Sequence, residues 1–154
     1  MAVAIPAGLL IWILANVSAG GVSLLSHLSS CLDPLGRLMG MDGVILTAFI
    51  LGWPANEIVL PIILMCYMSA GTLTDYESLA DLHCILTANG WTLTTALCTM
   101  TFCLFHWPCS TTCLTVKKET GSLRWTAAAL LIPALTGTVL CILLASFCRL
   151  AGLG

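Results

Sequence analysis

Charged side chains are scarce in this sequence of 154 residues. Lysine and arginine number five, aspartate and glutamate number seven, and together they make up 8% of the chain. Hydrophobic residues make up 59%, and the mean hydropathy is +1.05. A chain so poor in charge cannot solvate its own surface in water, and its net charge of −2 offers no basic surface to nucleic acid. The composition therefore excludes a nucleic-acid-binding protein and indicates an integral membrane protein whose partner is the lipid bilayer.

Three sequence patterns are missing as well. The sequence contains no G-x-x-x-x-G-K-[ST] run, so it has no nucleotide site of this kind. No basic residue precedes Arg37, whereas a cleaved signal peptide needs a basic start. The nine cysteines include no C-x-x-C pair and indicate neither a disulfide framework nor a zinc finger. In apolar helices cysteine is usually a small hydrophobic residue, and we assign that role to Cys66, Cys98, Cys103, Cys141 and Cys148.

Apolar runs dominate what is present. About 20 apolar residues cross a bilayer core of about 30 Å as a helix, and four runs qualify: residues 2–18, 43–74, a stretch within 82–116, and 125–148. Residues 22–38 and 76–88 mix leucines with polar side chains and predict interfacial amphipathic helices, the first of them broken at Pro34. We therefore expect an all-α integral membrane fold with about four transmembrane helices.

The loops between these runs predict an orientation. Residues 117–124 hold three of the five basic residues, and Arg37 lies between the first two spans. Residues 75–81 hold three acidic residues and no lysine or arginine. Because basic loops stay in the cytoplasm, we expect the 117–124 loop and Arg37 inside and the 75–81 loop outside.

The second and third spans are interrupted by two similar motifs, GWPANE at residues 52–57 and HWPCST at residues 106–111. Proline cannot donate a backbone hydrogen bond and crowds the carbonyl one turn back, so each Trp-Pro predicts a break. Irregular backbone persists at membrane depth only where protein or a wet cavity surrounds it. Paired breaks of this kind mark the binding site of many transporters. The alternative is an ordinary proline kink repaired by neighbouring helices.

The chemistry beside the breaks favours a cation path over that alternative. Glu57 is the only charged residue between Gly43 and Thr74, and a carboxylate at the bilayer centre costs at least about 2.5 kcal/mol on lenient scales. No lysine or arginine within the spans can pair with it, so a cation from solution is a natural partner. Carboxylate, imidazole and thiolate suit Fe(II), Mn(II) or Zn(II), whereas Mg(II) and Ca(II) prefer oxygen alone. We predict a metal path at Cys109, Glu57, Asn56, His106, Ser110 and Thr111, with Cys113 as a weaker candidate.

Several long motifs carry a resemblance to a known family. They are LDPLG at 32–36, DGVIL at 42–46, AFILGWPANEI at 48–58, GWT at 90–92, FHWPCSTT at 105–112 and KKETG at 117–121. Over nearly the whole chain the sequence resembles the C-terminal membrane part of the ferrous iron transport protein B family, FeoB. The resemblance implies multi-pass Fe(II) uptake across a bacterial or archaeal inner membrane, with Fe(II) as the transported ion. It also implies that HWPCSTT belongs to the second of two Gate regions, that Cys109 lines the iron path, and that Glu57 is the family's intramembrane glutamate.

The sequence departs from that family in length. Members begin with a cytoplasmic GTPase domain and a first Gate region, and neither is found here. We therefore expect a single membrane domain over residues 1–154, either a fragment or the second half of a split transporter. Its expected partner is a GTPase-bearing first half on another chain, or another copy of itself.

Two functions stay open on this reasoning. The first is a permease half that moves Fe(II). The second is a structural or regulatory subunit, or a decayed fragment, that lies outside the ion path. We do not expect an enzyme, because a proline separates His106 from Cys109 and no acid in the same segment orients them.

Overall fold

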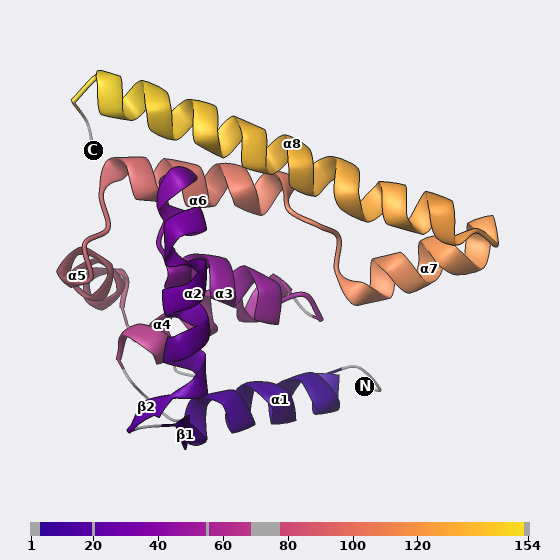
Figure 1. The fold of residues 1–154 in the computed structure, drawn as a ribbon, viewed down its shortest axis with the longest axis horizontal. Coiled ribbons are helices and arrows are strands. Elements are labelled where there is room, and N and C mark those ends of the chain that lie inside the picture. The colour runs from indigo at the N-terminus through magenta and orange to yellow at the C-terminus, as the bar shows by residue number, and fades with distance from the viewer. Residues whose placement is uncertain (1–3, 20, 55, 69–77, 153–154) are drawn as a thin grey trace.

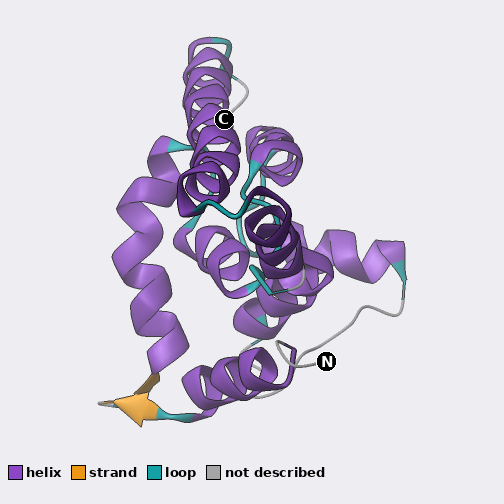
Figure 2. Ribbon diagram, turned by 90° about the vertical axis from the view of Figure 1, so that its right-hand side faces the viewer, coloured by secondary structure: helices purple, strands orange, loops and turns teal. Residues whose placement is uncertain are grey.

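The computed structural model describes residues 4–19, 21–54, 56–68 and 78–152, and nearly all of this is helix (Figure 2). The elements in chain order are α1 (Ala4–Asn16), β1 (Ser18–Ala19), β2 (Val22–Ser23), α2 (Leu24–Leu38), α3 (Gly43–Leu51), the 3₁₀ turn η1 (Asn56–Ile58), α4 (Val59–Tyr67), α5 (Leu79–Ala88), α6 (Leu93–Phe105), α7 (Ser110–Thr120) and α8 (Leu123–Leu150). The two strands pair antiparallel over two residues each, and they only turn the chain between α1 and α2. The all-α expectation is confirmed.

Polar residues set where several of these helices begin. Ser23, Asp42, Ser78 and Thr92 each stand before a helix, and each side chain accepts a hydrogen bond from the backbone N–H three residues on. Such caps satisfy donors that the first helical turn leaves open. The turn between α7 and α8 is made by Gly121, whose φ of 63° suits glycine.

Helix α8 is the longest element. Its 28 residues extend about 42 Å at 1.5 Å per residue, and among the described residues it alone is long and apolar enough to cross a bilayer unaided. It contains the fourth predicted span, while the count of four spans stays a prediction. Helices α6 and α7 follow one another along α8 in the opposite direction (Figure 1). Gly137 permits close approach, because a Cβ there would lie 2.9 Å from the Cβ of Phe105.

Helices α2 and α3 meet at an angle of 110°. Two glycines allow the contact: a Cβ on Gly43 would lie 1.9 Å from the Ser29 carbonyl oxygen, and a Cβ on Gly36 would lie 2.6 Å from the Asp42 carbonyl oxygen. The predicted break at Pro34 is wrong, because α2 runs through it to Leu38. Proline removes one intrahelical hydrogen bond, but packing against α3 on both sides of that position keeps the helix continuous.

The second predicted span is a helical hairpin. Helix α4 returns along α3 (Figure 1), so that the Tyr67 hydroxyl at the end of α4 donates to the Asp42 carboxylate before the start of α3. The Tyr67 oxygen in turn accepts from Nε1 of Trp91 at 2.8 Å, just before α6 begins. Residues 43–67 therefore start and finish at the same end of the molecule. The sequence predicted one span over residues 43–74, whereas in the structure residues 43–67 turn back on themselves, because these contacts join residues 24 and 25 positions apart.

The same end of the molecule holds the α2–α3 turn and the end of α8. The Arg149 guanidinium donates to the Arg37 carbonyl, and a Cβ on Gly40 would meet Ala145 of α8 and Cys98 of α6, each at 2.8 Å. The predicted orientation is corrected here, since Arg37 lies at the opposite end of α8 from the 117–124 turn rather than on the same side. Asp75 and Glu77 lie outside the described residues.

The core lies where the hairpin meets α6. Ile45, Phe49, Ile62 and Ile63 of the hairpin are buried together with Phe102 of α6. The rings of Phe49 and Phe102 meet edge to face with centroids 4.9 Å apart, a favoured aromatic geometry. This packing holds the tip of the hairpin beside the gap between α6 and α7.

Candidate functional site

Both helical interruptions fall at the Trp-Pro pairs. Helix α3 ends at Leu51, and regular structure resumes only at Asn56. Helix α6 ends at Phe105, after which His106 and Cys109 are extended, with ψ angles of 174° and 160°, until α7 begins. The prediction that both apolar runs are broken at Trp-Pro is confirmed.

The two breaks contact each other. The Trp53 indole Nε1–H donates to the Pro108 carbonyl at 3.1 Å, and the Ser110 backbone N–H donates to the Trp53 carbonyl at 3.1 Å. The Ser110 hydroxyl also reaches the Pro54 carbonyl at 3.5 Å. The carbonyls of Trp53, Pro54 and Pro108, which lie in the breaks, thus each find a donor in the opposite break. We call this set of three hydrogen bonds the break contact.

An apolar cavity adjoins the break contact. It has a volume of about 290 Å³ and is lined by Ile50, Trp53, Trp107 and Leu130. The indole Nε1 of Trp107 is buried and has no hydrogen-bond partner among the described residues. Tryptophans from both breaks therefore share one apolar space beside α8.

Cys109 is the residue immediately before α7, and its thiol is partly exposed. Its Sγ lies 3.1 Å from the Thr111 hydroxyl and 3.2 Å from the Thr112 hydroxyl. The start of a helix and nearby hydroxyl donors both favour a thiolate. Cys113, one turn on, is buried and directs its thiol to the Pro108 carbonyl at 3.6 Å. Of the two cysteines, Cys109 is the one that the structure leaves available to a ligand.

The His106 ring packs among aromatic side chains. Its centroid lies 5.4 Å from that of Phe49, 6.3 Å from Phe102 and 6.4 Å from Trp107. Nδ1 lies 2.9 Å from the Cys103 carbonyl oxygen, while Nε2 is buried without a partner among the described residues. A buried ring nitrogen without a partner costs free energy. Nε2 of His106 is therefore an atom that a ligand inside the protein could use.

The other predicted ligands lie in different surroundings. Ser110 is 8% exposed and takes part in the break contact, whereas Thr111 is exposed and contacts Cys109. Asn56 and Glu57 are exposed on η1, the turn at the tip of the hairpin, and the structure gives their side chains no partner among the described residues. Within the described ranges, no three His, Cys, Asp or Glu side chains are close enough to share a metal ion. The predicted ligands therefore form two groups on two adjoining breaks, and no single cage.

The remaining cysteines separate into buried and exposed ones. Cys98 of α6 and Cys141 of α8 are fully buried, and each directs its thiol to the other's carbonyl, at 3.9 and 3.3 Å. Cys148 is also buried. The packing role is confirmed for these three, while Cys66 is partly buried and Cys103 lies on the exposed side of α6.

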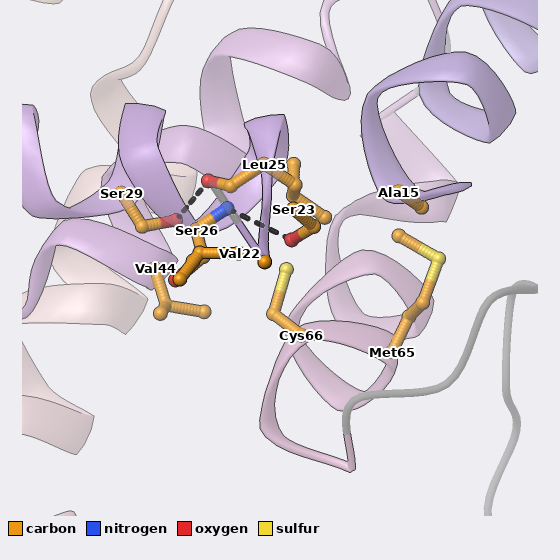
Figure 3. A pocket seen from close by; sticks show the side chains of 10 residues that line it. Ala15, Val22, Ser23, Leu25, Ser26, Ser29, Val44, Met65 and Cys66 are labelled. Atoms are coloured by element: carbon orange, nitrogen blue, oxygen red, sulfur yellow. Dashed lines mark hydrogen bonds between the residues drawn. The ribbon is translucent and has the colours of Figure 1, made fainter. Parts of the chain in front are cut away.

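Sequence reasoning missed a cavity of about 370 Å³ between the end of α1, the start of α2 and the hairpin (Figure 3). Ser23, Ser26, Ser29 and Cys66 line part of it. The Ser29 hydroxyl donates to the Leu25 carbonyl at 3.0 Å, and Ser23 accepts from the Ser26 N–H at 3.2 Å, so these serines complete hydrogen bonds of α2 itself. The repeated serines of residues 22–38 were the sequence feature that pointed to a polar surface here. The cavity itself depends on how α2 crosses the hairpin.

Comparison with known proteins gives two findings. A family model described as Gate: Nucleoside recognition matches residues 1–123. Two curated proteins named Fe(2+) transporter FeoB, from the Staphylococcus aureus strains MSSA476 and MW2, are each 28% identical to this chain over 131 residues, which is 84% of this chain and 19% of the relative. The chain thus spans about a fifth of the length of these relatives. No solved structure matches it.

Proposed function

The chain belongs to the Gate family, described as nucleoside recognition, and from this membership we propose that it forms part of the ion path of a ferrous iron transporter in the inner membrane. The likeness to two proteins named Fe(2+) transporter FeoB supports Fe(II) as the transported ion. The apolar composition and the long apolar helix α8 support a membrane location. Gate domains are components of transporters, which supports the proposal that this chain has no catalytic role of its own.

The observation that carries this proposal is the break contact. Broken helices at membrane depth persist where their free backbone groups find partners or line a wet path. Here Trp53 and Ser110 satisfy several of those groups, while the thiol of Cys109 at the same place remains available. Cys109 supplies the soft ligand that distinguishes Fe(II) from Mg(II) and Ca(II), and the Thr111 and Ser110 oxygens replace part of the water around the ion.

Glu57 and Asn56 have a separate role in this proposal. Their exposed place at the hairpin tip suits the first capture of a hydrated cation, because a carboxylate without a cationic neighbour attracts positive charge. The ion then passes to Cys109 at the adjoining break. His106 becomes a ligand through its unused Nε2 if the ion reaches the aromatic cluster. The ion is handed between two groups of ligands, which agrees with the absence of a three-ligand cluster in the described part of the chain.

The rest of the transporter is proposed to come from another polypeptide. This chain corresponds to about a fifth of each relative, so the energy-coupling GTPase and the first Gate region would be supplied by a partner chain, or a second copy would complete the path. The lipid bilayer covers the outward apolar side chains of α8, such as Ile132, Leu135, Leu143 and Phe147.

One observation favours the alternative of a structural or regulatory subunit. No three His, Cys, Asp or Glu side chains come together within the described residues, and a subunit outside the ion path needs no such group. The two functions differ in what they predict for Cys109 and Glu57. A permease half loses transport when either is altered, whereas a structural subunit does not.

The test is Fe(II) uptake by cells that express the chain with its partner, at matched protein levels. We expect Cys109→Ser and Glu57→Gln each to lower uptake at least about tenfold, as loss of groups at a metal site typically does. Cys141→Ser is the matched control for the thiol, since Cys141 is buried between α6 and α8. Glu119→Gln is the control for the carboxylate, since Glu119 is exposed near the end of α7.

A second readout reports binding directly. In membranes, Fe(II) should protect Cys109 from alkylation, measured by mass spectrometry of the peptide that contains it. If the variants transport like their controls and Fe(II) gives no protection, the chain lies outside the ion path and the structural function is the correct one.

A further inference from the structure

Trp53 holds the peptide groups on both sides of Cys109. Its indole N–H donates to the Pro108 carbonyl, which belongs to the peptide before the Cys109 Cα, and its carbonyl accepts from the Ser110 N–H, which belongs to the peptide after it, both at 3.1 Å. Between two planar peptides only φ and ψ can rotate. We infer that Trp53 is a positioning residue that fixes the backbone of Cys109 and so the direction of the Cα–Cβ bond that carries its thiol. This inference rests on the proposed function, in which that thiol binds the transported cation.

The peptide after Cys109 has one further backbone bond, from the Cys113 N–H to the Cys109 carbonyl at 3.1 Å within α7, whereas the remaining contacts of this segment are weaker. The Pro108 carbonyl has one further partner, the Cys113 thiol at 3.6 Å, and a thiol is a weak donor. The Ser110 hydroxyl reaches the Pro54 carbonyl only at 3.5 Å. Neither proline has an N–H to offer. Among the described residues, the two bonds to Trp53 are therefore the short hydrogen bonds that tie the segment before α7 to the other break.

The surroundings of Trp53 make these bonds persistent. Trp53 is 41% exposed, and its ring lines the apolar cavity with Ile50, Trp107 and Leu130. Backbone groups at membrane depth cannot exchange a lost protein partner for solvent without a large cost. A thiol held in one direction loses less conformational freedom when it binds a metal, so binding is tighter.

Two variants remove the two restraints one at a time. Trp53→Phe keeps an aromatic ring and deletes the indole donor. Ser110→Pro deletes the N–H that reaches the Trp53 carbonyl. It is compared with Ser110→Ala, because both lose the hydroxyl that bonds to Pro54 and is proposed as a ligand, and only the proline loses the N–H. The backbone accepts the proline, because a residue before proline prefers the extended conformation that Cys109 has, with ψ 160°, and proline is favoured at the first position of a helix. Trp125→Phe is the matched control, because Trp125 is exposed at the start of α8.

Two quantities are measured in membranes that contain the full chain. The first is the rate at which iodoacetamide modifies Cys109 without metal, and the second is the Co(II) concentration that halves this rate. We expect Trp53→Phe and Ser110→Pro to change the metal-free rate and to raise the half-protecting Co(II) concentration about tenfold, which corresponds to the loss of one hydrogen bond. Trp125→Phe should match the unaltered chain in both.

Alkylation of the buried Cys98 and Cys141 in the same samples separates positioning from folding. A positioning role leaves both protected, whereas a general structural role exposes them together with Cys109. The inference is overturned if both variants expose these two thiols, or if they leave the reactivity of Cys109 and its Co(II) protection unchanged. If Co(II) never protects Cys109 in the unaltered chain, the proposed function fails, and the metal-free rates still decide whether Trp53 positions the thiol.

Discussion

Removing the hydroxyl of Tyr67 should loosen the hairpin at its base. In the structure this hydroxyl donates to the Asp42 carboxylate and accepts from Nε1 of Trp91, so it joins the start of α3, the end of α4 and the start of α6. Tyr67→Phe leaves the carboxylate oxygen and the indole N–H without these partners. A hydrogen bond to a charged group contributes about 1.5–3 kcal/mol and one between neutral groups about 0.5–1.5 kcal/mol. Because the site is partly buried, we expect a loss of about 2–4 kcal/mol in the free energy of unfolding.

A double-mutant cycle isolates the bond between Tyr67 and Asp42. Asp42→Ser is the suitable second change, because serine still accepts from the Ile45 N–H at the start of α3, while its shorter side chain does not reach the Tyr67 hydroxyl. We expect a coupling energy of about 1.5–3 kcal/mol between the two substitutions, in the range of direct partners. The assay is unfolding in mixed micelles, titrated with a denaturing detergent and followed by tryptophan fluorescence. Additive effects of the two changes would refute the closed hairpin.

The other predictions concern the close helix contact and the orientation of the chain. Gly43→Ala should cost about 3 kcal/mol or more in unfolding free energy, because its Cβ would lie 1.9 Å from a backbone oxygen of α2. Gly90→Ala, with open space around it and a φ of 82°, should cost only about 1–2 kcal/mol, and equal losses would contradict the α2–α3 packing. In a background without reactive thiols, a cysteine at Ser122 should be labelled from the cytoplasm, since three of the five basic residues lie in that turn. Cysteines at Leu38 and Ser78 should be labelled from outside, and labelling of Leu38 from the cytoplasm would contradict the placement of Arg37 beside the end of α8.

The helical breaks were predictable because their cause is local. Proline lacks an N–H wherever it stands, and Trp-Pro inside an apolar run leaves few other outcomes. The surroundings of Cys109 are local too, since its thiol contacts hydroxyls two and three residues ahead. Pro34 shows the limit of such reasoning, because packing against α3 keeps α2 helical through a residue that disfavours it.

The path of the chain between the breaks was not predictable from one sequence. Apolar runs of suitable length read as crossings whether the chain continues or turns back. The turn is set by contacts between distant residues, such as Tyr67 with Asp42 and Arg149 with Arg37. The same holds for the site. The similarity of the two Trp-Pro motifs could be recognised in the sequence. Their direct contact through Trp53 and Ser110 could not, because it depends on the packing of the hairpin against α6.

The prolines of three separate elements lie at one level of the molecule. Pro54 and Pro108 belong to the break contact, and Pro133 of α8 stands between Leu130, which lines the cavity beside Trp53, and Gly137, which lies against Phe105. Each proline removes a backbone hydrogen bond from its element, and sharp helix bends concentrate at such positions. The backbone hydrogen bonds that these prolines cannot make are therefore missing within one layer of the molecule, next to the Cys109 thiol.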